Sequence, residues 1–306
     1  MKRSDNVAYR NDGMKRQGRA RFTQPKKPSR GFSQLIALLL VVSLAASLLG
    51  LGAKHSILDR NFTTKQIVTT GNVAELHKGL SGTINSFITG SNVPAQLQGN
   101  LITEEQIKND LQNAINNLYD GKRVVLNPTR VVKQVSNNFM NLANEKNIPT
   151  QTEEFLSYKS NFIAQVETVV NNQFQNSLLQ KTASFMAKAK KVFPAMYLGG
   201  TVVSAILGCL LLFQTRSLFR FAHYAGLAFV FSGAIVWLLF QFIKISGLIT
   251  NASESIGMYQ DITTEYGTKV VAIFVRYAVI YGYIGLILVL VGIFGAIFRR
   301  FIFRQS

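Results

Sequence analysis

The side chains that could ligate a metal or activate a nucleophile are few and scattered in this sequence. It contains three histidines, His55, His77 and His223, and a single cysteine, Cys209. None of them has a neighbour at a metal-ligand spacing such as His-x-x-x-His or Cys-x-x-Cys. The sequence therefore predicts no metal site, no other cofactor and no catalytic residue, and we expect the protein not to be an enzyme.

Charged residues are missing from the segments where they would be most informative. Four long runs contain no Asp, Glu, Lys or Arg, at residues 32–53, 192–213, 221–243 and 277–298. Ionisable side chains within membrane-spanning segments usually mark proton relays, ion paths and substrate sites. Their absence argues against a proton-coupled transporter and against an intramembrane protease that uses Asp or Glu.

Each uncharged run is long enough to cross a bilayer, which takes about 20 apolar residues. Of the 306 residues, 48% are hydrophobic and only 16% are charged, whereas a soluble domain carries about 25% charged residues. We therefore predict an all-α integral membrane protein with four transmembrane helices. The first run follows a basic segment, as in a signal peptide, but it is longer than the usual core of about 7–15 residues. We interpret it as an uncleaved anchor.

Small residues recur along the second, third and fourth runs at helical spacing. In lipid, helices associate through close backbone approach, which small residues permit. We interpret them as contacts within one bundle, and a homo-oligomer contact or a pore lining is the alternative. The predicted helix-packing residues are Gly200, Ser204, Gly208, Gly226, Gly282, Gly285, Gly292 and Gly295.

The net charge of +18 comes mainly from three short segments that alternate with the predicted spans. By the positive-inside rule, these segments and both termini lie in the cytoplasm. There they would contact the anionic inner leaflet of the bilayer, and an RNA-binding arm around residues 16–22 is the less favoured alternative. The predicted membrane-surface residues are Lys15, Arg16, Arg19, Arg21, Lys26, Lys27, Arg30, Arg216, Arg220, Arg299, Arg300 and Arg304.

The segment between the first two runs carries the patterns of four amphipathic helices. We predict N-caps at Asn72 and Asn127, and a capping box that begins at Thr103. Asp120–Gly121 has the sequence of a helix C-cap. Residues 122–126 could form a short strand, although nothing obvious pairs with it.

The fourth of these helices is predicted to begin with a capping box at Thr150–Glu153. Its apolar stripe continues through Phe185 to a basic collar at Lys188–Lys191, directly before the second span. Pro194 predicts a kink or a break at that point. Further along, Tyr259, Ile262 and Tyr266, with Ile256, indicate an interfacial or domain-packing helix between the third and fourth spans.

These patterns together predict a helical extracytoplasmic domain inserted between the first and second transmembrane helices. In chain order, the predicted segments are a basic disordered cytoplasmic tail (1–31), transmembrane helix 1 (32–53), the extracytoplasmic helical domain (54–191), transmembrane helix 2 (192–213), a cytoplasmic turn (214–220), transmembrane helix 3 (221–243), an extracytoplasmic loop with an interfacial helix (244–276), transmembrane helix 4 (277–298) and a basic cytoplasmic tail (299–306).

For function, we favour a non-enzymatic scaffold, receptor or accessory subunit of a bacterial cytoplasmic membrane. Its outer helical domain would bind another membrane or envelope protein, since the sequence shows no cytoplasmic output domain. A channel or transporter subunit with an oligomeric pore is the alternative. An enzyme acting on lipid or cell wall is the weakest hypothesis, because no acid–base pair supports it.

Overall fold

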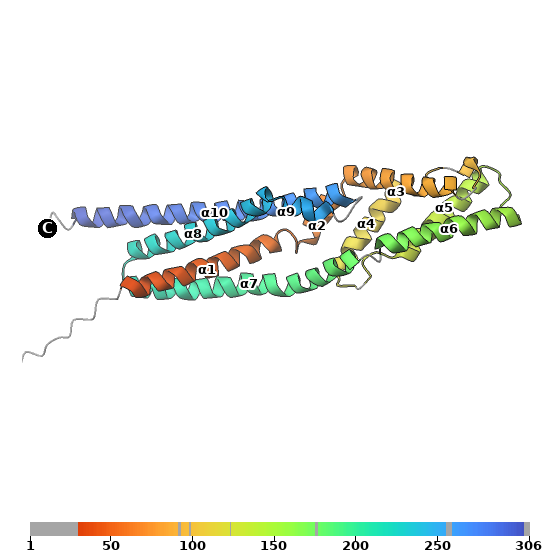
Figure 1. The fold of residues 1–306 in the computed structure, drawn as a ribbon. Coiled ribbons are helices and arrows are strands. Elements are labelled where there is room, and N and C mark those ends of the chain that lie inside the picture. Colours follow the sequence, from red (N-terminus) through yellow and green to blue (C-terminus); the bar gives the residue numbers. More distant parts are fainter. Residues whose placement is uncertain are drawn as a thin grey trace, which may run out of the picture.

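The computed structural model describes residues 30–302 except 91–92, 98, 123, 175–176 and 255–258. The described residues form an elongated molecule built from helices, with no strand among them (Figure 1). This confirms the all-α fold class, and the short strand considered at residues 122–126 does not form in the described part of that segment. The elements are α1 (Arg30–Lys54), α2 (Arg60–Ile67), α3 (Thr70–Gly90), a 3-10 turn η1 (Ala95–Leu97), α4 (Glu104–Tyr119), α5 (Pro128–Glu145), α6 (Glu153–Phe174), α7 (Ser177–Thr215), α8 (Leu218–Ile245), α9 (Leu248–Glu254) and α10 (Gln260–Ile302).

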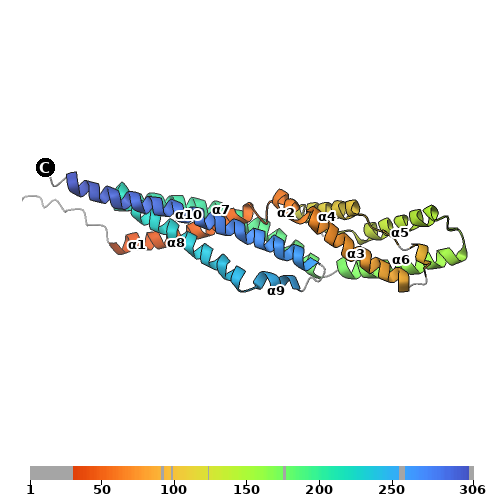
Figure 2. The same cartoon turned by 90° about the horizontal axis from the view of Figure 1, so that it is seen from above.

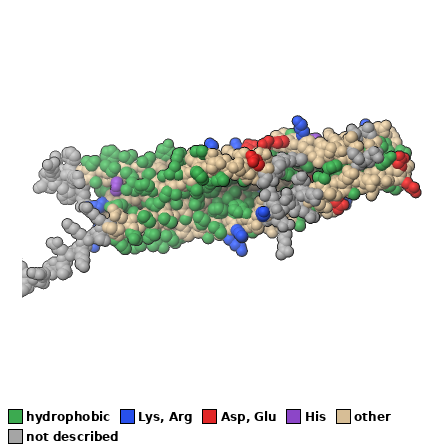
Figure 3. Space-filling model, viewed as in Figure 1, with side chains coloured by type: hydrophobic (Ala, Val, Ile, Leu, Met, Phe, Trp, Pro, Cys, Tyr) green, Lys and Arg blue, Asp and Glu red, His purple; other side chains and the backbone are tan. Residues whose placement is uncertain are grey.

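Four helices, α1, α7, α8 and α10, are long and apolar enough to cross a membrane, as predicted. They lie side by side in one half of the rod, and α3 to α6 form a lobe at the other end (Figures 1 and 2). The surface of the first half is largely apolar, and charged side chains appear where the lobe begins (Figure 3). We call the two halves the bundle and the lobe. The side of the membrane on which the lobe lies stays a prediction.

The bundle consists of two helix pairs. α7 packs chiefly on α1 and α10 packs chiefly on α8, while α1 joins the pairs through its contact with α8. Between the pairs, the buried residues Ile36, Leu40 and Leu44 of α1 meet Leu211 of α7 and Ala228 of α8. The remaining faces of these helices expose large apolar side chains, as expected for surfaces that lipid covers.

Helix α10 is far longer than the span predicted at residues 277–298. Its 43 residues correspond to about 64 Å, roughly twice the thickness of the hydrocarbon layer of a bilayer. Tyr259, Ile262 and Tyr266 therefore do not form a separate loop helix, since Tyr259 precedes α10 directly and the other two lie in its first turns. Ile256 lies outside the described residues.

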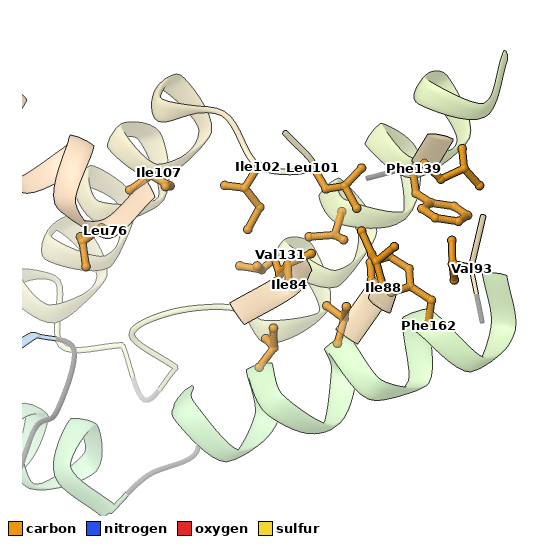
Figure 4. Packing of buried hydrophobic residues seen from close by; sticks show 14 of the residues in the cluster. Leu76, Ile84, Ile88, Val93, Leu101, Ile102, Ile107, Val131, Phe139 and Phe162 are labelled. Carbon is orange, nitrogen blue, oxygen red and sulfur yellow. The ribbon is translucent and has the colours of Figure 1, made fainter. Parts of the chain in front are cut away.

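The core of the lobe is formed by the apolar faces of α3, α4, α5 and α6 (Figure 4). At its centre, the Phe139 ring stacks on Phe162 and Phe155 with centroid distances of 5.0 and 5.8 Å. Ile262 of α10 is buried in the same core, and Tyr259 packs against it. The first turn of α10 is thus part of the lobe, and the same helix continues into the bundle.

Local capping explains where the lobe helices begin. Thr103 and Gln106 form the predicted capping box at the start of α4. The predicted cap at Thr150 was wrong by two residues, because the hydroxyl of Thr152 accepts the hydrogen bond from the Phe155 amide. The prediction for Asn72 was also wrong: it lies inside α3.

Asn72 instead completes the preceding helix. Its Nδ2 donates to the carbonyls of Gln66 and Ile67, the last residues of α2, at 3.2 and 3.0 Å. A side-chain amide can satisfy carbonyl groups that a helix end leaves unpaired. The short α2 and the start of α3 are therefore fixed to each other.

The apolar stripe of α6 does not continue in register into α7. Two helices are present, and the join falls at residues 175–176, outside the described part. On α7, Met186 and Ala189 are buried while Phe185 is 54% exposed, so the predicted continuation through Phe185 was wrong. Of the kink or break predicted at Pro194, the break does not occur, because α7 continues through this residue; Gly50 of α1 lies against the α7 backbone at Phe193 and Tyr197.

Candidate functional site

The lobe meets the bundle around Tyr119, the last residue of α4. Its side chain is buried together with Ile115 of the same helix and Met186 of α7. The α1–α2 linker, α2 and α10 also contribute polar atoms to this contact, which we call the junction. Tyr119 of α4 thus contacts α7 and the segment of the α1–α2 linker and α2, and it reaches α10 through Thr63.

Hydroxyl groups form a chain across the junction. The Tyr119 hydroxyl donates to the Ile57 carbonyl at 2.7 Å, and its oxygen is also 2.7 Å from Thr63 Oγ1 of α2. Thr63 Oγ1 in turn is 3.0 Å from the Tyr266 hydroxyl of α10. Thr63 is only 3% exposed, so water is excluded from the middle of this chain. Hydrogen bonds are electrostatically stronger in such a buried environment than in water.

Two cations also contact Tyr119. Lys190 of α7 donates through Nζ to the backbone carbonyl of Tyr119, and its Nζ lies 5.2 Å from the centroid of the Tyr119 ring. The Arg60 guanidinium lies 5.8 Å from the same centroid and pairs with Asp120 at 2.5 Å. A cation at this distance from an aromatic ring is attracted to its face.

Burial raises the pKa of the Tyr119 hydroxyl well above its ordinary value. The phenol therefore remains protonated at neutral pH and can donate its hydrogen bond. These contacts connect the lobe to α7 through Lys190 and to α10 through Thr63 and Tyr266.

Below the junction, aromatic contacts continue along the bundle. The Lys54 ammonium of α1 lies 5.2 Å from the ring of Tyr197 on α7. The His55 and Tyr277 rings are 5.6 Å apart, and Phe240 of α8 stacks on a ring of α10. These contacts lie at the lobe-side ends of the four bundle helices.

A shallow groove lies beside the lobe, between α3 and the start of α10. It is open to solvent and has a volume of about 750 Å³. Its lining includes charges of both signs and two glycines. The lining residues are Glu75, Lys78, Gly79, Gly82, Thr83, Ser86, Gln260 and Asp261.

The structure places five of the seven predicted helix-packing glycines against a neighbouring helix. Gly226 of α8 and Gly285 of α10 face each other so closely that a Cβ atom on either would lie 2.6 Å from a backbone nitrogen of the opposite helix. Gly292 and Gly295 lie against the start of α8, and Gly200 lies against α1. A Cβ atom on Gly208 or Gly282 would have no neighbour within 4 Å.

Residues that the sequence analysis did not single out provide the partner side of the α1–α7 contact. Ser43 and Ser47 of α1 pair through their hydroxyls with Ser204 and Thr201 of α7, both at 2.8 Å. Gly200 packs between these two pairs. The four-residue spacing of two serines within an apolar run was the sequence signal for this contact. Ser204 was predicted, but its partner was not.

Five of the predicted membrane-surface residues fall in the described part of the chain, at the end of the bundle remote from the lobe. Arg216 and Arg220 are exposed at the turn between α7 and α8. The backbone of Arg30 begins α1, and those of Arg299 and Arg300 lie in the last turns of α10. The others lie outside the described residues: Lys15, Arg16, Arg19, Arg21, Lys26, Lys27 and Arg304.

Within the described part of the chain, no group of three or more His, Cys, Asp or Glu side chains could hold a metal ion. Comparisons with models of protein families, with curated proteins and with solved structures gave no match. The fold and the junction define a helical protein with four candidate membrane-spanning helices and a helical lobe fixed to two of them.

Proposed function

We propose that this chain is a non-enzymatic scaffold, receptor or accessory subunit of a bacterial cytoplasmic membrane, acting through a lobe on the extracytoplasmic side. The observation that carries the proposal is that two of the candidate membrane-spanning helices contact the lobe directly. Ile262 of α10 is buried in the lobe core, and Lys190 of α7 is bonded to Tyr119. A partner that binds the lobe therefore acts directly on two membrane helices.

The charge distribution supports the orientation. The basic residues around Arg216, at the start of α1 and at the end of α10 all lie at the end of the bundle remote from the lobe. The positive-inside rule assigns that end to the cytoplasm, which leaves the lobe outside. An anionic inner leaflet is the lipid partner of those residues.

The experiment that tests this function is site-specific photo-cross-linking in cells. A photoreactive residue at Thr83 or Ser86 samples the groove, and one at Lys122 or Lys146 samples exposed lobe surface elsewhere. We expect one stoichiometric membrane or envelope protein to be captured from a subset of positions, and to co-purify in mild detergent. A monodisperse monomer under every condition, with no position-specific product, would contradict the proposal.

A channel or transporter subunit is less well supported. A pore in an oligomer needs small-residue faces that are free, whereas Gly200, Gly226, Gly285 and Gly292 contact neighbouring helices within one chain. Liposome flux distinguishes the hypotheses. If the chain conducts, bulky residues at Gly208 and Gly282 should change the flux, because these two positions face open space.

A further inference from the structure

Each bundle helix carries an exposed basic residue where its apolar segment ends on the side of the lobe. They are Lys54 of α1, Lys191 of α7, Lys244 of α8 and Arg276 of α10. Lys188 and Lys269 are exposed one to two turns further toward the lobe. In Figure 3, blue side chains flank the apolar half of the molecule at this boundary. We call these six residues the lobe-side girdle.

Contacts between α1 and α7 place their basic residues at one level along the rod. The Lys54 ammonium lies 5.2 Å from the Tyr197 ring. A Cβ atom on Gly50, one turn before Lys54, would lie 2.6 Å from the carbonyl oxygen of Phe193. Lys191 is two residues from Phe193, so it lies within one turn of the level of Lys54.

The pair α8 and α10 ends at the same level. Phe240, one turn before Lys244, stacks on Phe274 of α10 with centroids 4.2 Å apart. Phe274 precedes Arg276 by two residues and lies against Gly52 of α1. This contact ties the level of the second pair to that of the first.

The distance to the opposite end of each helix matches a bilayer. In each helix, the basic residue at the lobe side is about 24 residues, or about 36 Å along the axis, from an arginine at the remote end. These arginines are Arg30 for α1, Arg216 for α7, Arg220 for α8 and Arg299 for α10. A hydrocarbon layer of about 30 Å fits between the two levels, with both in the headgroup regions. The girdle therefore lies at the phosphates of the leaflet that faces the lobe.

None of the six girdle residues forms an ion pair with an acidic side chain of the described residues. The two ion pairs of the described residues, Arg60–Asp120 and Arg130–Asp110, include none of the six. The positive-inside rule also does not require cations at this end, because it predicts them at the other. Six exposed cations around all four helices thus need an external counter-charge.

We infer that the lobe-side girdle binds the phosphate groups of anionic phospholipids in the leaflet that faces the lobe. Ammonium and guanidinium groups form charge-assisted hydrogen bonds with phosphate oxygens, and long side chains on helix ends reach the headgroups. The binding does not depend on the partner of the lobe or on which face of the membrane the lobe occupies.

The chain contains its own reporter for this leaflet. Its single tryptophan, Trp237, is 39% exposed on α8. It lies seven residues before Lys244, or about 10 Å below the girdle, on the lobe side of the middle of the bilayer. Brominated acyl chains quench tryptophan fluorescence on contact, so Trp237 reports the lipids around the lobe-side half of the bundle.

The test compares quenching of full-length protein by brominated phosphatidylglycerol and brominated phosphatidylcholine in proteoliposomes. We expect phosphatidylglycerol to be preferred by about fivefold or more at Trp237, since one basic residue near the surface supplies a factor of this size. The preference should fall strongly in a variant with Lys54→Gln, Lys191→Gln, Lys244→Gln and Arg276→Gln, which removes four of the six girdle charges. A variant with Arg at the three lysine positions should retain it and shows that the sites tolerate substitution.

Two matched variants separate the girdle from other charges. Neutralising four exposed lysines of the lobe changes the net charge by as much as neutralising the four girdle residues, and it should leave the lipid preference unchanged. The four lobe lysines are Lys108, Lys122, Lys133 and Lys146. Arg216→Gln with Arg220→Gln should also leave it unchanged, because these residues contact the opposite leaflet. Equal quenching of the wild-type protein by both lipids would overturn the inference, as would a preference that the loss of these four girdle charges leaves unchanged.

Discussion

Replacing Tyr119 by phenylalanine tests whether the junction holds the lobe to the bundle. The substitution removes one hydroxyl and keeps the ring, so the contacts of the ring with Lys190 and Arg60 remain. The Ile57 carbonyl loses a donor at 2.7 Å. Thr63 loses one neighbour but retains the Tyr266 hydroxyl at 3.0 Å.

The expected loss follows from this count of partners. A buried polar group left without its partner costs about 1–3 kcal/mol. One carbonyl is orphaned while Thr63 retains a partner, so we expect Tyr119→Phe to lower the free energy of unfolding by about 1–2 kcal/mol. The measurement is reversible unfolding in mixed detergent micelles, monitored by circular dichroism.

Tyr158→Phe is the matched control, because the Tyr158 hydroxyl is exposed and bonds only Glu154 one turn away. This change should cost less than about 0.5 kcal/mol. If Tyr119→Phe destabilises the protein no more than Tyr158→Phe does, the junction contributes nothing and the reasoning fails.

Alkaline pH provides a second readout for the same pair. The pKa of Tyr119 is raised in the folded protein, whereas a tyrosine in the unfolded chain ionises near pH 10. The folded state therefore binds more protons above about pH 10, and stability falls as the pH rises through that range. The free energy of unfolding of the Tyr119→Phe variant should therefore fall less above about pH 10 than that of the wild-type protein. The same pH dependence in both proteins would contradict the assignment.

Three further predictions test other parts of the molecule. Gly285→Leu should destabilise the α8–α10 contact by about 1–3 kcal/mol in thermal unfolding, whereas Gly208→Leu, which faces open space, should be close to neutral. Burial raises the pKa of Asp110 despite the nearby Arg130, so ionisation of this carboxyl lowers the free energy of unfolding as the pH rises above the ordinary pKa of an aspartate. The Asp110→Asn variant lacks this loss, and between about pH 4 and pH 7 its free energy of unfolding in denaturant titrations should rise relative to that of the wild-type protein. A cysteine at Asn127 in a cysteine-free background should react with an impermeant maleimide in intact cells, and protection from the reagent until lysis would place the lobe in the cytosol.

The local parts of the fold were predictable because they depend on neighbouring residues. The capping box at Thr103 needs only the side chain three residues later, and it forms as expected. The start of α6 shows the limit of this logic. Two threonines, Thr150 and Thr152, precede the same glutamates, and the pattern alone did not decide which hydroxyl caps the helix.

The junction was not predictable, because its members come from segments that only the fold brings together. Tyr119 precedes a predicted C-cap and looks like the end of an ordinary amphipathic helix. Lys190 was assigned to a basic collar with Lys188 and Lys191, and nothing in the sequence distinguishes it from them. Its different role follows from the rotation of about 100° per residue along α7, which turns Lys190 toward the lobe and leaves Lys191 exposed.

That rotation has a mechanical consequence at the membrane surface. Lys190 bonds the lobe at Tyr119, and the next residue belongs to the girdle that we assign to the phosphates. On the other side of the bundle, α10 carries Ile262 in the lobe core and Gly285 in close backbone contact with α8. A tilt of the lobe must therefore move Lys191 relative to the headgroups, bend α10 or separate it from α8. Since close helix packing resists separation, we expect a displacement of the lobe to be transmitted to the helices at the membrane surface.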